Sequence, residues 1–153
     1  MKIRLLLPFL ILDVYATLLV LGGVYAYTQA PAGANASTAV IIPTVAALLA
    51  AGCAVVVLLG QTKPLLWKAG AWSGIVLAIL LSVAFAMPAS KRGEQLLNYP
   101  EALEAFEAAT SRGENFDDAS RKAFFRERSS PDHDTTYLVR TLWSLTALSG
   151  LVA

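Results

Sequence analysis

Residues 37–60 form an uninterrupted run without a single charged side chain. As an α-helix rising 1.5 Å per residue, this run would be ~36 Å long, which exceeds the ~30 Å hydrocarbon core of a bilayer. A water-soluble helix of this length normally carries charged and polar residues along one face, and this run carries no charge on any face. The run therefore predicts a membrane-spanning helix, with lipid as the solvent for at least part of the chain.

The composition of the whole chain agrees with a membrane protein. Of its 153 residues, 56% are hydrophobic and 15% are charged, whereas roughly a quarter of the residues of a soluble domain are charged. A net charge of +1 provides no basic surface for nucleic acid, and one cysteine excludes a multi-thiolate metal site. No hydrolase, metalloprotease, P-loop or dinucleotide-binding motif occurs. We expect no cofactor and no metal, and favour a role other than catalysis.

The distribution of charge divides the rest of the chain. Residues 88–136 hold seven basic and ten acidic side chains, while all other residues together hold five basic and one acidic. Further apolar runs cover 5–28, 65–87 and 137–153. We therefore predict an all-α, polytopic membrane helix bundle. Residues 1–153 would form a single membrane domain with four transmembrane helices and a short-helical polar insert before the last.

Two of these spans allow another interpretation. The run at 5–28 follows Lys2 and Arg4, as in a signal peptide, but its apolar stretch continues past Asp13, beyond the usual hydrophobic region of such a peptide. An uncleaved helix is therefore favoured. The run at 137–153 is at the lower limit for crossing a membrane. Its alternative is a helix that packs into the bundle without reaching the far side.

Small residues recur every four positions in two of the runs, a spacing that lets membrane helices approach each other closely. They predict the helix-packing faces, and a homodimer seam is the alternative use of the same stripes. Leu77 lies off the stripe and is expected to face lipid. The two stripes consist of Gly70, Gly74, Ala78 and Ser82 in the third span and Ala46, Ala50 and Ala54 in the second.

Basic residues in short flanks predict the orientation of the helices across the membrane. Lys2, Arg4, Lys63 and Lys68 fall at one membrane face, whereas the connection at 29–36 contains no basic residue. This distribution predicts cytoplasmic termini and an extracytoplasmic insert. The Lys-Arg pair that follows the third span favours the opposite orientation.

Inside the insert, residues 98–101 (Asn-Tyr-Pro-Glu) resemble the start of a helix, because proline is tolerated in the first turn and an acid there is favoured by the helix dipole. Gly113 is expected to end this helix, and a second short helix is expected at 116–128. The two helices either cover the mouth of the bundle or lie on the membrane surface, against lipid headgroups or a partner.

Asp13 is the only acid in any expected span, and a charge within a span costs on the order of 3 kcal/mol on insertion scales. We expect it to be protonated, or paired with Arg140 of the last span, as part of a ligand or proton site. An inert pair near the interface is the alternative. His133 lies between two aspartates, and a solvated turn is favoured there over a metal site.

Residues 15–27 read Tyr-Ala-Thr-Leu-Leu-Val-Leu-Gly-Gly-Val-Tyr-Ala-Tyr. This segment resembles the first helix of the Tmem14 family, small four-helix membrane proteins associated with the export of fatty acids and other apolar cargo. The resemblance implies a bundle that binds or passes a fatty acid or lipid, with Gly22 and Gly23 helping to shape the site.

A second resemblance lies toward the other end of the chain. Pro88, residues 97–98 (Leu-Asn) and the Arg140-Thr141 pair ahead of an apolar tail are similar to the anthrone-oxygenase-like family of four-helix membrane proteins. That family tends to carry a His where this chain has Tyr137. The resemblance implies a small membrane-bound oxygenase.

The leading hypothesis is a non-enzymatic, multi-pass membrane protein that binds or passes an apolar ligand such as a fatty acid or lipid. Its ligand site would include Asp13, Gly22, Gly23 and Arg140. The second hypothesis is a structural or accessory subunit of a larger membrane complex, or a homo-oligomer, and the third is an oxygenase-like enzyme. Membrane lipid is the expected partner, and nucleic acid is not.

Overall fold

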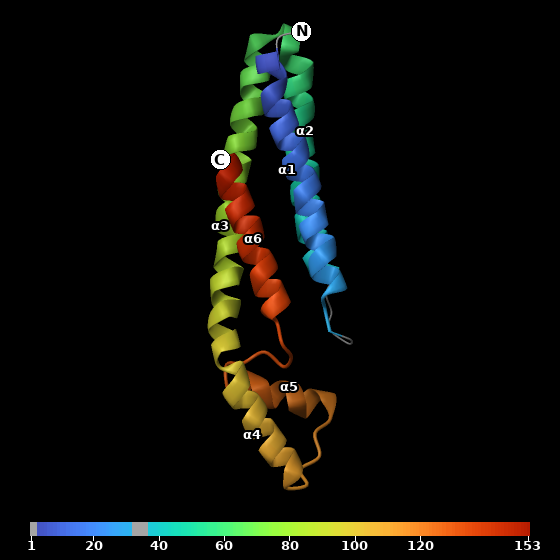
Figure 1. Cartoon of the computed structure of the whole chain (residues 1–153), viewed down its shortest axis with the longest axis vertical. Helices are drawn as coiled ribbons and strands as arrows, with labels where there is room; N and C mark the ends of the chain where they lie inside the picture. The colour runs from blue at the N-terminus through green and yellow to red at the C-terminus, as the bar shows by residue number, and fades with distance from the viewer. Residues whose placement is uncertain (1–2, 32–36) are drawn as a thin grey trace.

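The computed structural model describes residues 3–31 and 37–153, and within them every regular element is a helix (Figure 1). The expected all-α fold is confirmed for this part of the chain; Lys2 and residues 32–36 lie outside it. The elements are α1 (Ile3–Thr28), α2 (Ser37–Leu59), the short 3₁₀-helix η1 (Gly60–Thr62), α3 (Pro64–Leu97), α4 (Tyr99–Ser111), α5 (Asp118–Glu127) and α6 (Thr136–Val152).

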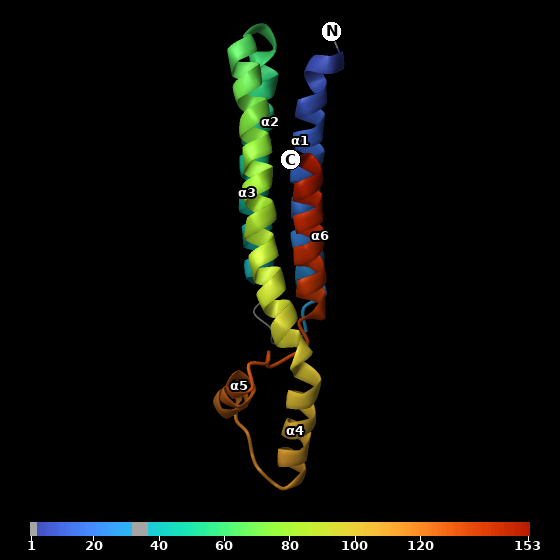
Figure 2. The same ribbon diagram turned by 90° about the vertical axis from the view of Figure 1, so that its left-hand side faces the viewer.

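Three stretches of helix are long and apolar enough to cross a membrane: Leu6–Thr28, Ser37–Thr62 and Pro64–Leu97. They identify an integral membrane protein. α6 has 17 residues, or ~26 Å of helix, and is not among them, so the prediction of four transmembrane helices is not confirmed. Both views show α6 ending well short of the N-terminal end of α1 (Figure 1, Figure 2), as in the alternative in which this helix does not reach the far side.

The bundle is formed by α1, α2, α3 and α6. α1 packs along α2, α2 along α3, α3 along α6, and α6 against α1, so that the four helices enclose a common core. The N-terminus and the connection between α2 and α3 lie at one end of the bundle (Figure 1). The opposite end, where α1 ends and α2 and α6 begin, is called the insert end below because α4 and α5 project from it (Figure 2).

α3 continues through Pro88 to Leu97 without a break. The polar insert expected to begin at residue 88 therefore starts as a continuation of helix α3. An interior proline removes one backbone hydrogen bond, but membrane helices tolerate it. The change in composition at residue 88 thus marks the end of the apolar run and not the end of the helix.

The small residues of α3 lie in the seams of the bundle, and Gly70, Gly74 and Ala78 are buried. A Cβ on Gly70 would lie 2.7 Å from the backbone nitrogen of Val57 in α2, and one on Gly74 would lie 2.7 Å from a methyl carbon of Leu12 in α1. The small residues of α3 therefore contact different neighbouring helices, α2 at Gly70 and α1 at Gly74.

One turn further along α3, Ser82 meets the last helix of the bundle. Its hydroxyl donates a hydrogen bond to the carbonyl oxygen of Thr146 in α6 at 3.3 Å. In α2, Ala46, Ala50 and Ala54 are at most 3% exposed. The expectation that Leu77 faces lipid is wrong, because this side chain is partly buried against the bundle core.

The insert forms the two helices expected from its sequence. α4 begins after Asn98 and ends before Gly113, whose φ of +89° lies in the left-handed region that favours glycine. α5 begins at Asp118, and the side chain of Asp117 caps it by accepting a hydrogen bond from the backbone amide of Ser120 at 2.7 Å.

Aromatic rings join α4 to α5. The ring centroid of Phe106 in α4 lies 4.9 to 5.5 Å from those of Phe116, Phe124 and Phe125. The guanidinium carbon of Arg128 lies 3.6 Å from the centroid of the Phe124 ring, a cation–π contact. The insert thus has its own small core beside the bundle.

Candidate functional site

A cavity of about 400 Å³ lies at the insert end of the bundle. It separates two helix pairs, α1–α2 and α3–α6, which diverge toward this end (Figure 1). All four bundle helices contribute to its lining, as does the segment that leads into α6. Its volume falls within the range of small-molecule sites, roughly 300–1,000 Å³.

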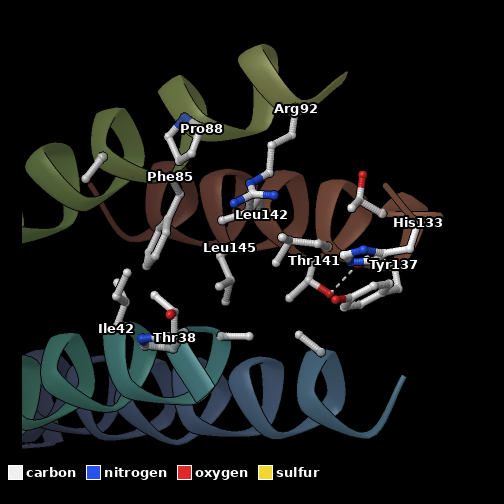
Figure 3. A pocket seen from close by; sticks show the side chains of 16 residues that line it. Thr38, Ile42, Phe85, Pro88, Arg92, His133, Tyr137, Thr141, Leu142 and Leu145 are labelled. Carbon is white, nitrogen blue, oxygen red and sulfur yellow. Dashed lines mark hydrogen bonds between the residues drawn. The ribbon is translucent and has the colours of Figure 1, made fainter. Parts of the chain in front are cut away.

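Apolar side chains form most of the cavity wall. Ile42 and Pro43 come from α2, Phe85 from α3, and Leu142 and Leu145 from α6. Figure 3 shows Phe85 and Leu145 pointing from their helices toward α2. These two residues are 2% and 3% exposed and belong to the bundle core, so the packing of the bundle holds them in place.

Polar side chains gather toward the insert. Arg92 comes from α3, Tyr137 and Thr141 come from α6, and His133 comes from the segment before α6. In Figure 3 the guanidinium of Arg92 extends from α3 toward α6, into the space that these residues share. The hydroxyl of the buried Thr141 donates to the backbone carbonyl of Tyr137 at 2.8 Å. The cavity is therefore amphipathic, apolar toward the core and polar toward the insert.

His133 is held in place by its neighbours. Its Nδ1 lies 2.7 Å from Oδ1 of Asp132, and the carbonyl oxygen of Asp132 accepts a hydrogen bond from Arg121 of α5 at 3.0 Å. The insert thus positions one side chain of the cavity. His133 lies in a bend before α6 and is half-buried. In residues 3–31 and 37–153, no three His, Cys, Asp or Glu side chains gather where they could hold a metal ion.

Arg92 brings positive charge to the cavity without an acidic partner. None of the described residues that line the cavity is acidic. The ion pairs found in the described part of the chain join Arg112 to Glu114 and His133 to Asp132, and Arg92 takes part in neither. Its charge is therefore available to a ligand.

Asp134 stabilises the start of α6. Its carboxylate accepts hydrogen bonds from the hydroxyl of Thr136 and from the backbone amide of the same residue, the latter at 2.8 Å. These bonds hold the pKa of Asp134 below its ordinary value, and the positive charge of Arg140 acts in the same direction. The exposed Arg140 therefore interacts with an acid at the insert end.

Asp13 does not meet Arg140. The hydrogen bond between Tyr15 and Ser149 sets the register of α1 against α6. Asp13 lies two residues from Tyr15, toward the end of the bundle that holds the N-terminus. Arg140 lies nine residues from Ser149, toward the insert end. At ~1.5 Å per residue, the two are separated by ~16 Å along the bundle axis. Asp13 is exposed on the outer face of α1 and does not line the cavity.

Gly22 and Gly23 are sites of close helix packing. A Cβ on Gly22 would lie 2.9 Å from a methyl carbon of Leu145 in α6, and one on Gly23 would lie 2.9 Å from the carbonyl oxygen of Ala39 and 3.1 Å from Cβ of Pro43 in α2. Neither glycine lines the cavity, but each allows the close approach of residues that do.

The sequence alone favours other roles for the polar residues of the cavity. It marks Arg92 as an orientation signal, His133 as a turn residue and Tyr137 as a departure from a family pattern. One signal could have found them: polar residues that flank the ends of apolar runs on the same membrane face. Arg92 follows the third run, and Tyr137 opens the last.

No protein-family model, curated protein or solved structure matches the chain.

Proposed function

We propose that this chain is a non-enzymatic, multi-pass membrane protein that binds or passes an apolar ligand, a single-chain lipid such as a fatty acid, in the cavity at the insert end. The observation that carries the proposal is the amphipathic lining of this cavity, with Phe85 and Leu145 toward the core and Arg92 and Tyr137 toward the insert. The resemblance of residues 15–27 to the Tmem14 family favours the same function.

The position of the cavity along α3 supports this proposal. The apolar run of α3 ends at Met87, and Lys91 and Arg92 follow one turn later. Basic side chains mark the membrane interface, where they reach the headgroups. Phe85 therefore lies at the depth of the acyl chains and Arg92 at the depth of the headgroups. A lipid in the cavity would keep the same alignment that it has in the bilayer.

Photolabelling tests the proposal. The protein is placed in discs of phosphatidylcholine with an analogue of hexadecanol that carries a diazirine in its chain. We expect the label on cavity-lining residues of α2 and α6, and we expect excess hexadecanol to compete with it. Loss of label in the presence of excess hexadecanol distinguishes binding in the cavity from general contact with bulk lipid.

Two neighbouring isoleucines provide a matched pair of variants. Ile42 lines the cavity and Ile41 does not, although they are 51% and 58% exposed. Ile42→Trp should fill the cavity and abolish the competed label, while Ile41→Trp should leave the label unchanged. Label that hexadecanol does not reduce, or that persists equally in both variants, would show that the cavity is not the ligand site.

One observation favours a second function, that of an accessory subunit in a larger membrane complex. Asp13 and Thr17 are exposed on a face of α1 that no described helix covers. A carboxyl group facing lipid is costly, and a partner helix with a basic or hydroxyl side chain would lower this cost. Native mass spectrometry of the gently solubilised protein distinguishes the two functions, because a partner chain supports the second and a bound lipid alone supports the first.

A further inference from the structure

The charge of Arg92 should make the cavity prefer a ligand that carries a negative charge over one that is uncharged. Arg92 is always charged, and none of the described residues that line the cavity is an acid. The residue is exposed, so solvent stabilises its charge, but it has no ion-pair partner among the described residues. An anionic group on the ligand would compensate this charge.

Other polar groups lie where they can assist Arg92. The hydroxyl of Tyr137 forms no hydrogen bond with any described residue and lies on the same side of the cavity as Arg92 (Figure 3). Asp132 holds His133 at the edge of the same space. The hydroxyl of Thr141 already donates to the backbone of α6. Arg92 and Tyr137 are therefore two donors that are available to a ligand, and the hydroxyls of Thr38 and Thr135 also line the cavity.

We propose that the cavity selects an anionic amphiphile, a single apolar chain that ends in a carboxylate or a phosphate monoester. Arg92 binds its head group, Tyr137 donates to it, and the chain lies against Phe85 and Leu142. This inference rests on the function proposed above and narrows its single-chain lipids to those with an anionic head group. The planar guanidinium presents paired donors that match the oxygens of carboxylates and phosphates.

The competing explanation is that Arg92 only reaches outward to phospholipid headgroups, as interfacial arginines do. Its neighbour Lys91 serves as the control for this explanation. Lys91 is exposed at the same level of α3, carries the same charge and does not line the cavity. A general attraction between basic residues and lipid would involve both side chains, whereas ligand selection would involve Arg92 alone.

The experiment measures how well unlabelled hexadecanol, hexadecanoate and hexadecyl phosphate compete with the photoreactive hexadecanol in the same discs, at a pH where both acids are ionised. We expect at least one anion to compete at a roughly tenfold lower concentration than the alcohol, the effect of one charge-assisted hydrogen bond at a partly exposed site. The stronger anion identifies the head group as carboxylate or phosphate.

Three variants complete the test. Arg92→Gln should weaken competition by the anions until they compete no better than hexadecanol, Arg92→Lys should restore part of the preference, and Lys91→Gln should retain it in full. Equal competition by all three probes in the wild type, or a preference that survives Arg92→Gln, would overturn the inference while the proposed function stands. Absence of any competed label would overturn both.

Discussion

The phenol of Tyr15 in α1 and the hydroxyl of Ser149 in α6 form a 2.7 Å hydrogen bond inside the bundle. Their side chains are 1% and 0% exposed, and the residues stand 134 positions apart in the chain. The bond joins the first helix to α6 in a region that is otherwise apolar. The bond therefore stabilises the bundle and fixes the position of α1 along α6.

Removing either partner of this bond should destabilise the bundle by about 1 kcal/mol, because the remaining hydroxyl is left buried and unpaired. Tyr15→Phe and Ser149→Ala together should cost less than the sum of the single variants. Unfolding in mixed micelles measures the three free energies. Strict additivity would show that the two hydroxyls do not interact in the folded protein.

A methyl group on Gly70 should destabilise the protein by about 1–3 kcal/mol, the usual cost of overpacking. The nearest atom is a backbone nitrogen of Val57, which cannot move aside as a flexible side chain can. Gly52→Ala is the control, because nothing lies within 4 Å of its Cβ position and alanine favours the helix. If both substitutions prove neutral in a thermal unfolding experiment, α2 and α3 are not in close contact at this seam.

Asp13→Asn and Arg140→Gln should act independently on stability. The register of α1 against α6 keeps these residues apart, so their effects on the free energy of unfolding should add to within about 0.5 kcal/mol. The same measurement on the double variant checks this prediction. A coupling above about 1 kcal/mol would require the two side chains to be in contact.

The first turns of α5 and α6 should become less stable at acidic pH. Hydrogen bonds from Ser120 hold the pKa of Asp117 below its ordinary value, and those from Thr136 do the same for Asp134. Each carboxylate therefore stabilises the fold above its unfolded pKa, and this contribution is lost as the pH falls through the lowered folded pKa.

Hydrogen exchange at the backbone amides of Ser120 and Thr136 follows this loss. Protection should decrease below about pH 4 in the wild type. Asp117→Asn with Asp134→Asn should show a flatter profile, because asparagine caps a helix but does not titrate. Identical profiles for wild type and double variant would assign the acid sensitivity to other groups.

Labelling of an introduced thiol tests the proposed orientation. Lys63 and Lys68 mark the end of the bundle opposite the insert, which would place the insert outside the cytoplasm. With Cys53→Ala as background, a thiol at the exposed Ser111 of α4 should react with an impermeant maleimide added to intact cells. Reaction only after permeabilisation would reverse the orientation.

The helices could be predicted from the sequence because each depends on a local signal. The charge-free run at 37–60, the proline after Asn98 and the glycine at 113 all act on their own segments. The end of α3 could not be predicted in this way. Hydropathy changes at Pro88, but the backbone continues as a helix to Leu97, since helix formation and membrane burial are separate properties.

The candidate site depends on register, which no local signal determines. Asp13 and Arg140 are the acid and the base of two apolar runs, and pairing them is reasonable until α1 and α6 are aligned. The alignment depends on Gly22 against Leu145 and on Tyr15 against Ser149, contacts between residues more than a hundred positions apart. The alignment of α3 against α6, to which the hydrogen bond from Ser82 to Thr146 contributes, brings Arg92 and Tyr137 to one cavity.

The two walls of the cavity are completed at different times during synthesis. α1 and α2 are consecutive and can pair as a hairpin early, whereas α3 acquires its partner α6 only after the whole insert has been made. Until then the side chain of Phe85 lacks the α6 residues that complete its surroundings. A ligand that binds only the finished bundle would stabilise it by mass action. The proposed ligand would thus favour the last step in the assembly of the bundle.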